Sequence, residues 1–203
     1  MDAIVPKDNK KINKKNSVSR EEAEKAVKTL IKWAGDDPTR EGLKETPKRV
    51  VNAFNEFFVG YKESPENVLS KTFNDVHGYN DIVMLTDISI HSHCEHHMVP
   101  IVGKVHLAYY PNKKVVGISK LARVVEIFAK RLQTQETMTQ QICDTIQDVL
   151  KPKGVAVYVE AIHQCMTTRG VNKPGVATIT SCFTGKFKTD ARSERKFFDF
   201  IKK

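Results

Sequence analysis

The spacing of apolar residues changes near residue 82, and this change constrains the fold more than any other feature of the sequence. Before it, apolar residues recur at helical spacing, and helices are expected over 19–35 and 46–60. After it, segments 82–91 and 99–109 are rich in Val, Ile, Leu and Tyr, which favours strands. The chain therefore passes from a helical region into a region that contains a sheet.

Two further helices are expected after these strands, and two strands and a last helix follow them. The ranges are a helix from Ser119, a helix near 136–150, strands at 154–163 and 175–187, and a helix near 190–201. This order is typical of an α+β fold with an antiparallel sheet and helices on one face. The hydrophobic fraction is 40%, but no run reaches the roughly 20 apolar residues of a membrane helix, so no membrane partner is expected.

Residues 1–20 contain six basic and two acidic side chains, so they hold much of the formal net charge of +9. Their low apolar content predicts a disordered basic arm over 1–18, and a solubilising tail is a simpler interpretation of it than a docking segment. A helical region over 19–80 and a sheet-containing region over 81–203 are expected to follow. The charge excess leaves nucleic acid, an acidic surface and a phosphorylated small molecule open as partners.

Capping residues support both N-terminal helices. Ser19 and Glu22 have the spacing of a capping box, in which each side chain accepts a hydrogen bond from the other residue's backbone N–H. Thr46 is a suitable N-cap, because Pro47 then occupies the first helical position.

The run His-Ser-His-Cys-Glu-His-His over 91–97 holds four of the seven histidines and one of the four cysteines. Cys94 and His97 have the Cys-x2-His spacing that lets a thiolate and an imidazole bind one ion in a turn. If the strand before His163 continued past it, His163 and Cys165 would share one face, which makes Cys165 the candidate third ligand. Three protein ligands with an open position are typical of a catalytic zinc site, and four of a structural one.

Plainer interpretations exist for these residues. A Cys-x2-His pair in a loop is common without a metal, Cys143 fits a helix core, and Cys182 fits a buried thiol in a strand. His77, His91, His93 and His106 are interpreted as surface or core residues. Four cysteines without a secretion signal favour reduced thiols or metal ligands over disulfides, so a cytoplasmic location is expected.

Candidate phosphate and base contacts lie elsewhere in the chain. Ser119, Lys120 and Arg123 place a hydroxyl and two cations at a helix start, where free N–H groups favour an anion. Arg169 could add a bidentate phosphate donor near the metal, and the carboxylate of Glu136 matches the paired N–H donors of guanine. Each has a plainer alternative as a helix cap, a surface cation or a first-turn residue that stabilises the helix dipole.

Together these segments resemble the GTP cyclohydrolase I family, from about Ser19 to the C-terminus. The most specific motifs are Cys94-Glu95-His96-His97, Gly117-Ile118-Ser119-Lys120-Leu121-Ala122-Arg123, Gln133-Thr134-Gln135-Glu136, and His163-Gln164-Cys165-Met166 with Arg169-Gly170. The resemblance implies the tunnelling fold, in which subunits join their sheets into a barrel. It also implies a decamer of two pentamers, with active sites at subunit interfaces.

By this resemblance, Cys94, His97 and Cys165 would bind Zn²⁺, and His96 and His163 would be the catalytic proton carriers. The purine pocket would include Gln135 and Glu136, and the triphosphate site would include Ser119, Lys120, Arg123, Arg169 and Arg49. The implied reaction converts GTP and water into 7,8-dihydroneopterin triphosphate and formate, the first step of pterin and tetrahydrofolate biosynthesis. Nucleic acid is not an expected partner.

The chain departs from the family pattern at Met98 and at Asn52, and the segments Thr167-Thr168 and Asn172-Lys173-Pro174-Gly175-Val176 are also atypical. Met98 stands where Phe is expected after the His-His pair, and Asn52 stands where some members carry a basic residue. Three alternatives exist: a relative of the same fold that acts on another purine or pterin, and two other classes of protein. A zinc nucleobase deaminase needs a Pro-Cys-x2-Cys ligand pair, which the sequence lacks. A basic nucleic-acid-binding module with structural zinc would need a closed site of four ligands.

Overall fold

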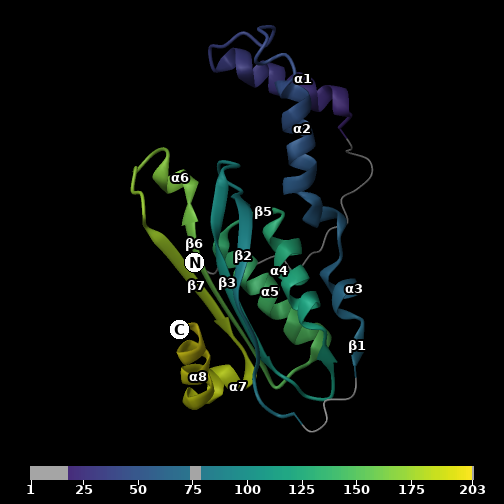
Figure 1. The fold of residues 1–203 in the computed structure, drawn as a ribbon, viewed down its shortest axis with the longest axis vertical. Helices are drawn as coiled ribbons and strands as arrows, with labels where there is room; N and C mark the ends of the chain where they lie inside the picture. The colour runs from purple at the N-terminus through teal and green to yellow at the C-terminus, as the bar shows by residue number, and fades with distance from the viewer. Residues whose placement is uncertain (1–17, 74–78, 203) are drawn as a thin grey trace, which may run out of the picture. The chain divides into compact units, whose positions relative to one another are not determined.

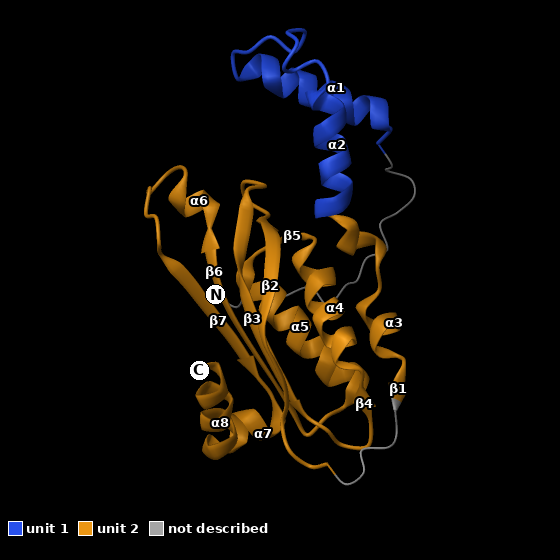
Figure 2. Cartoon of the chain, viewed as in Figure 1, with its two compact units in different colours: residues 1–57 blue, residues 58–203 orange. Residues whose placement is uncertain are grey.

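The computed structural model describes residues 18–73 and 79–202, and the predicted arm lies outside this part apart from Val18. His77 also lies outside it. The chain divides into two compact units, with the boundary between Phe57 and Phe58 (Figure 2). The helical region expected over 19–80 therefore contributes residues to both units.

The first unit contains α1 (Arg20–Trp33) and α2 (Thr46–Phe57), which pack against each other. The predicted capping box of α1 is present, because the Ser19 hydroxyl accepts from Glu22 N at 3.2 Å and Glu22 Oε2 accepts from Ser19 N at 2.9 Å. Helix α2 begins at Thr46 itself, one residue earlier than predicted. The Thr46 hydroxyl donates to the backbone oxygen of Gly42 at 3.5 Å, so it closes the turn before the helix.

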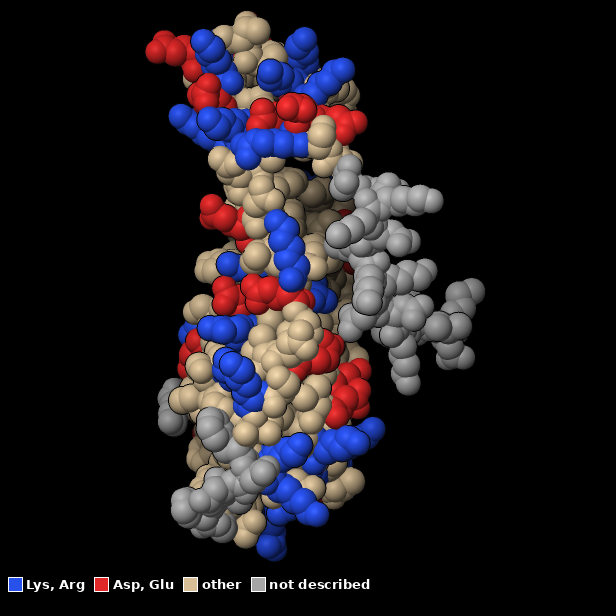
Figure 3. All heavy atoms as spheres, turned by 90° about the vertical axis from the view of Figure 1, so that its right-hand side faces the viewer, with Lys and Arg blue, Asp and Glu red and all other residues tan. Residues whose placement is uncertain are grey.

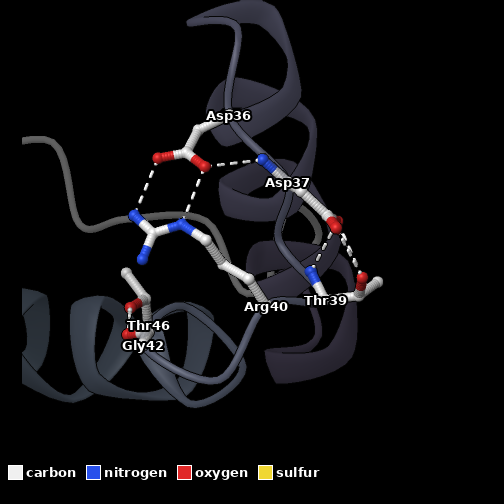
Figure 4. Close-up of polar contacts among 6 residues, drawn as sticks. All are labelled: Asp36, Asp37, Thr39, Arg40, Gly42 and Thr46. Carbon is white, nitrogen blue, oxygen red and sulfur yellow. Dashed lines mark hydrogen bonds and ion pairs between the residues drawn. The ribbon is translucent and has the colours of Figure 1, made fainter.

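Two acidic residues organise the turn between these helices (Figure 4). Arg40 donates from Nε and Nη2 to the Asp36 carboxylate, both at 2.8 Å, and this pairing lowers the pKa of Asp36 to about 2. Thr39 donates to Asp37 from its backbone N–H and its hydroxyl, at 2.8 and 2.7 Å. Both carboxylates are therefore used within the turn itself.

The second unit is built on a five-stranded sheet in the order β5-β2-β3-β6-β7 (Figure 1). The strands are β2 (Val83–Cys94), β3 (Pro100–Tyr110), β5 (Leu132–Gln133), β6 (Gly154–His163) and β7 (Ala177–Phe183). All neighbours are antiparallel except β5, which pairs in parallel with the end of β2. A separate pair joins β1 (Thr72–Phe73) to β4 (Val115–Val116). The α+β class with an antiparallel sheet is thus confirmed.

Two long helices cover one face of the sheet, α4 (Ile118–Ala129) and α5 (Gln135–Leu150) (Figure 1). The main core lies between them and the sheet, and it includes Val105, Leu107, Leu121, Val125, Ile142 and Val157. A smaller cluster contains Ala108, Tyr110, Ala156, Phe187 and Phe197. Ala108 and Tyr110 alternate with the core residue Leu107 along β3, so α7 (Gly185–Thr189) and α8 (Ala191–Ile201) pack on the opposite face at one end.

Element boundaries differ from the predicted ones where short structures interrupt a pattern. The strand predicted over 154–163 matches β6, but β7 is shorter than the predicted 175–187, because Gly185 adopts a φ of 48° and starts α7. The elements η2 (Val59–Lys62), α3 (Pro65–Leu69) and α6 (Gln164–Thr167) were not predicted. Within the described ranges, the helices are all too short or too polar to cross a membrane.

Candidate metal centre

The end of β2 and the turn after it hold the Cys-Glu-His-His motif. Cys94 is the last residue of β2; its N–H donates to Val99 O at 2.9 Å, and its carbonyl accepts from Met98 N at 2.8 Å. Glu95 N donates to Gln133 O of β5 at 3.0 Å. Met98 has a φ of 54°, in the left-handed region, which lets so short a turn close. The motif is therefore held on both sides by backbone hydrogen bonds.

Cys165 also lies beside this motif, but on an element that the sequence did not predict. The strand β6 ends at His163, and Cys165 belongs to the helical turn α6. The expectation that alternation along a strand aligns His163 with Cys165 was therefore wrong. The ligand atoms of Cys94, His97 and Cys165 nevertheless all lie within 4.8 Å of one another. These residues form a Cys-His-Cys group that could hold a metal ion.

The chemistry of this donor set fits a bound cation. Ligand atoms about 2.3 Å from one tetrahedral ion lie roughly 4 Å apart, a separation that this group allows. Burial and the neighbouring Cys94 both raise the pKa of the Cys165 thiol, because two thiolates side by side repel each other. A cation between the sulfurs would reverse this effect and stabilise both thiolates. Cys94 is buried, Cys165 is half-buried and His97 is exposed, so the group is open on one side.

The two histidines predicted as proton carriers lie close to this group. The Nδ1 atom of His96 is 3.6 Å from Cys94 Sγ, and its ring is exposed. His163 is half-buried, and its Nε2 lies 2.8 Å from Oε1 of Gln135. Burial lowers the pKa of His163, whereas the nearby carboxylate of Glu136 acts in the opposite direction.

Gln135 and Glu136 begin α5 but occupy different environments. Gln135 is fully buried, and its amide is bonded to groups of β6 and β7 as well as to His163. Glu136 is exposed, and its carboxylate is close enough to His163 to affect the pKa of that ring. The two adjacent residues thus place one side chain in the interior and one at the surface.

The predicted phosphate contacts are divided between two places. Arg169 lies at the metal group, with Nη1 2.8 Å from His97 Nε2. Helix α4 ends close to β5, whose Gln133 pairs with Cys94. Ser119, near the start of this helix, therefore lies about 15 Å along the helix from that end. Arg49 is exposed on α2 of the first unit.

A pocket of about 440 Å³ lies between α4 and β2, and Ser119 and Arg123 line it together with His91. The sequence predicts a surface or core position for His91; it is exposed, and its place in this pocket was not predicted. The partners of Gln135, Thr139 and Thr180 among them, were also missed. They are distant in sequence, and local patterns carry no signal for such contacts.

The fold and the site together define a class: an α+β protein with a Cys-His-Cys group that could hold a metal ion, beside two histidines. A family model described as GTP cyclohydrolase I matches residues 23–202, and the chain belongs to that family. This membership confirms the resemblance found in the sequence and the enzyme class expected from it.

Curated relatives agree over nearly the whole chain. GTP cyclohydrolase 1 of Hyphomonas neptunium is 62% identical over 202 residues, covering 98% of this chain and 97% of the relative. GTP cyclohydrolase 1 of Maricaulis maris is 59% identical over 206 residues, covering 100% of both chains. GTP cyclohydrolase 1 of Brucella anthropi is 60% identical over 182 residues, covering 90% of this chain and 85% of the relative.

Proposed function

We propose that this protein converts GTP and water into 7,8-dihydroneopterin triphosphate and formate, the first step of pterin and tetrahydrofolate biosynthesis. The observation that carries the proposal is the convergence of Cys94, His97 and Cys165, with His96 and His163 beside them, in a chain of this family. The names of the relatives support it. Unbridged cysteines in the described chain suit a reducing compartment, and we place the enzyme in the cytoplasm.

We assign zinc to the Cys-His-Cys group, because thiolate and imidazole donors with one open position suit this ion. When bound, zinc would act as a Lewis acid that activates water near neutral pH. Cys94 and Cys165 would contribute negative charge to the site, and His97 the third donor. Arg169, which lies beside His97, would place a positive charge near this group for a phosphate of GTP.

The reaction requires attack of water at C8 of guanine, opening of the imidazole ring, loss of formate and closure of a new ring by a ribose carbon. His163 would give a proton to N7 as the ring opens, because it is a histidine beside the metal group. His96 would carry a further proton during ring opening or rearrangement of the sugar. The exposed Glu136 carboxylate would accept the N1–H and N2–H₂ donors of guanine, and the buried Gln135 would belong to this pocket through its contact with His163.

The triphosphate would be held by Ser119, Lys120 and Arg123, together with Arg49 and Arg169. The first residues of α4 lie about a helix length from the metal group of the same chain. We therefore propose that GTP spans two copies, with the base at one metal group and the triphosphate at α4 of a neighbour. The outer strands β5 and β7 leave sheet edges to which other copies can pair, in keeping with a decamer of two pentamers.

The first test is to incubate the zinc-loaded protein with GTP and to measure formate and, after oxidation, a fluorescent pterin. Cys165→Ala should lose both zinc and formate release, because two ligands do not hold the ion. Cys143→Ala is the matched control, since Cys143 is buried in the core away from the group. Full activity and full zinc content in Cys165→Ala would remove Cys165 from the site.

A basic nucleic-acid-binding module remains the rival from another class. It predicts salt-sensitive binding of polynucleotides and no turnover of GTP. On the face that Figure 3 presents, Lys and Arg are interspersed with Asp and Glu over most of the surface, which does not favour a continuous basic stripe. The formate assay separates the two functions directly.

A further inference from the structure

The side-chain amide of Gln135 has only one acceptable orientation. The residue is fully buried, and its Nε2 donates to Thr178 O at 2.9 Å and to Val159 O and Thr180 Oγ1, both at 3.2 Å. Exchanging the nitrogen and oxygen would place Oε1 against two carbonyl oxygens and leave buried groups without hydrogen bonds. The acceptors around Nε2 therefore determine which end of the amide faces His163.

The amide oxygen fixes the position of a proton on His163. Oε1 of Gln135 lies 2.8 Å from Nε2 of His163. An amide oxygen can only accept, so Nε2 of the histidine carries the hydrogen in this contact. A neutral imidazole has one N–H, and its other nitrogen, here Nδ1, is then the acceptor.

The surroundings of Gln135 make this contact rigid. Gln135 is the first residue of α5, and the Thr134 N-cap accepts from Thr137 N at 3.2 Å, which fixes the start of the helix. The Thr139 hydroxyl donates to Gln135 O at 2.7 Å and lies 2.7 Å from Thr180 Oγ1. Helix α5 and strand β7 thus hold the backbone and the amide of one residue at the same time.

We infer, on the basis of the proposed function, that Gln135 is a positioning residue for His163. It holds the imidazole ring and its Nε2–H tautomer, so that Nδ1 is the nitrogen that exchanges a proton with the substrate. Catalytic bases are commonly oriented by a third group in this way. A fully buried amide whose donors are both used makes no contact with the purine, so Gln135 acts on the base only through His163.

Neutron diffraction from crystals of the zinc-loaded protein in heavy water reads the tautomer directly. The expected result is deuterium on Nε2 of His163 and an amide nitrogen of Gln135 that points to β6 and β7. Deuterium on Nδ1 alone, with Nε2 bare, would overturn the inference. This measurement needs no variant and no turnover, so it tests the inference even if a substitution at Gln135 prevents folding.

Kinetics separate positioning from purine binding. Gln135→Met keeps the size of the side chain but removes both hydrogen-bonding groups, and kcat should fall about 10- to 100-fold, with KM for GTP within about twofold of the parent. Gln147→Met, the matched control, lies on the same helix and loses a half-buried contact to Thr184, yet it leaves His163 untouched. Its kcat and KM should stay within about twofold of the parent.

The outcomes distinguish this inference from the proposed function. A raised KM with unchanged kcat in Gln135→Met would show contact with the purine and overturn the positioning role. Parent kcat in a folded Gln135→Met would also overturn it. A parent protein that releases no formate from GTP would reject the proposed function, and the tautomer of His163 would still be read from the neutron map.

Discussion

His106 illustrates, at the scale of one residue, how burial and a bulge together set the protonation of a side chain. It lies on β3 with 5% of its surface exposed. The register between β2 and β3 shifts between Leu85 and Ile88, and Asp87, in this bulge, has a φ of 57°. The Asp87 N–H donates to His106 Nδ1 at 3.3 Å, and Lys104 pairs with the Asp87 carboxylate at 2.8 Å. A neutral His106 is therefore part of the bulge.

Stability should consequently fall in mild acid. Burial lowers the pKa of His106, Lys104 adds to this effect, and Asp87 and Glu160 partly oppose it. In the unfolded state His106 has a pKa of about 6.5, so below that pH the unfolded chain binds more protons than the folded one. The stabilisation from neutral His106 is therefore complete above about pH 6.5 and is lost as the pH falls through the lowered pKa of the folded state. In urea unfolding at fixed protein concentration, the free energy of unfolding should fall less between pH 7.5 and 5.5 for His106→Gln than for the parent. An equal or larger loss would contradict this assignment.

At the scale of elements, the approach of β3 to β6 sets the distance between the two halves of the metal group. A Cβ added at Gly103 would lie 2.1 Å from Glu160 O and 2.5 Å from the Cα of Ala161. These backbone atoms have no free space to move into, because Ala161 is itself buried. Only glycine permits this pairing in the centre of the sheet.

Gly103→Ala should therefore lower the free energy of unfolding by roughly 2–3 kcal/mol through overpacking. Displacement of β6 should also weaken zinc binding, because Cys165 follows β6 directly. Gly117→Ala is the control, because an added Cβ there meets no atom within 4 Å. Its free energy of unfolding should stay within about 1 kcal/mol of the parent value. Urea unfolding and a competition assay for zinc give the two readouts, and a stable Gly103→Ala would show that the strands separate easily.

Some elements of the fold can be predicted from the sequence and others cannot. Apolar periodicity predicted β6, α4 and α5 closely, because their patterns are local and strongly regular. The same periodicity misplaced Cys165 on a strand, since nothing in it marks the start of the short α6. Cys94, His97 and Cys165 lie close together in the structure, as the sequence motifs predict. The hydrogen bonds of Gln135 depend on strands that come after it in the chain, and no local pattern encodes them.

At the scale of the whole molecule, a single chain keeps its metal group and its α4 phosphate candidates about one helix length apart. Lys120 of one copy and Cys165 of another would then complete a site between them. Two inactive variants that fail for different reasons can restore such a shared site when their subunits mix.

Cys165→Ala and Lys120→Ala, each inactive or nearly so alone, should regain about a quarter of the parent activity after unfolding and joint refolding at equal amounts, since both needed residues meet by chance at about one site in four. Formate release per subunit is the measurement. The two proteins refolded separately and then mixed serve as the control. No recovery in jointly refolded oligomers of normal size would place both residues in the same chain's site.

The position of Cys165, 71 residues after Cys94, has a consequence for biosynthesis of the protein. Cys94 and His97 leave the ribosome first, but two donors alone hold a zinc ion weakly. In the structure, Cys165 is placed beside them by the pairing of β6 with β3 at the centre of the sheet. At the proposed zinc site, capture of the ion would therefore be a late event in folding. A nascent chain short of β6 would hold no complete site and would not compete for the cell's zinc.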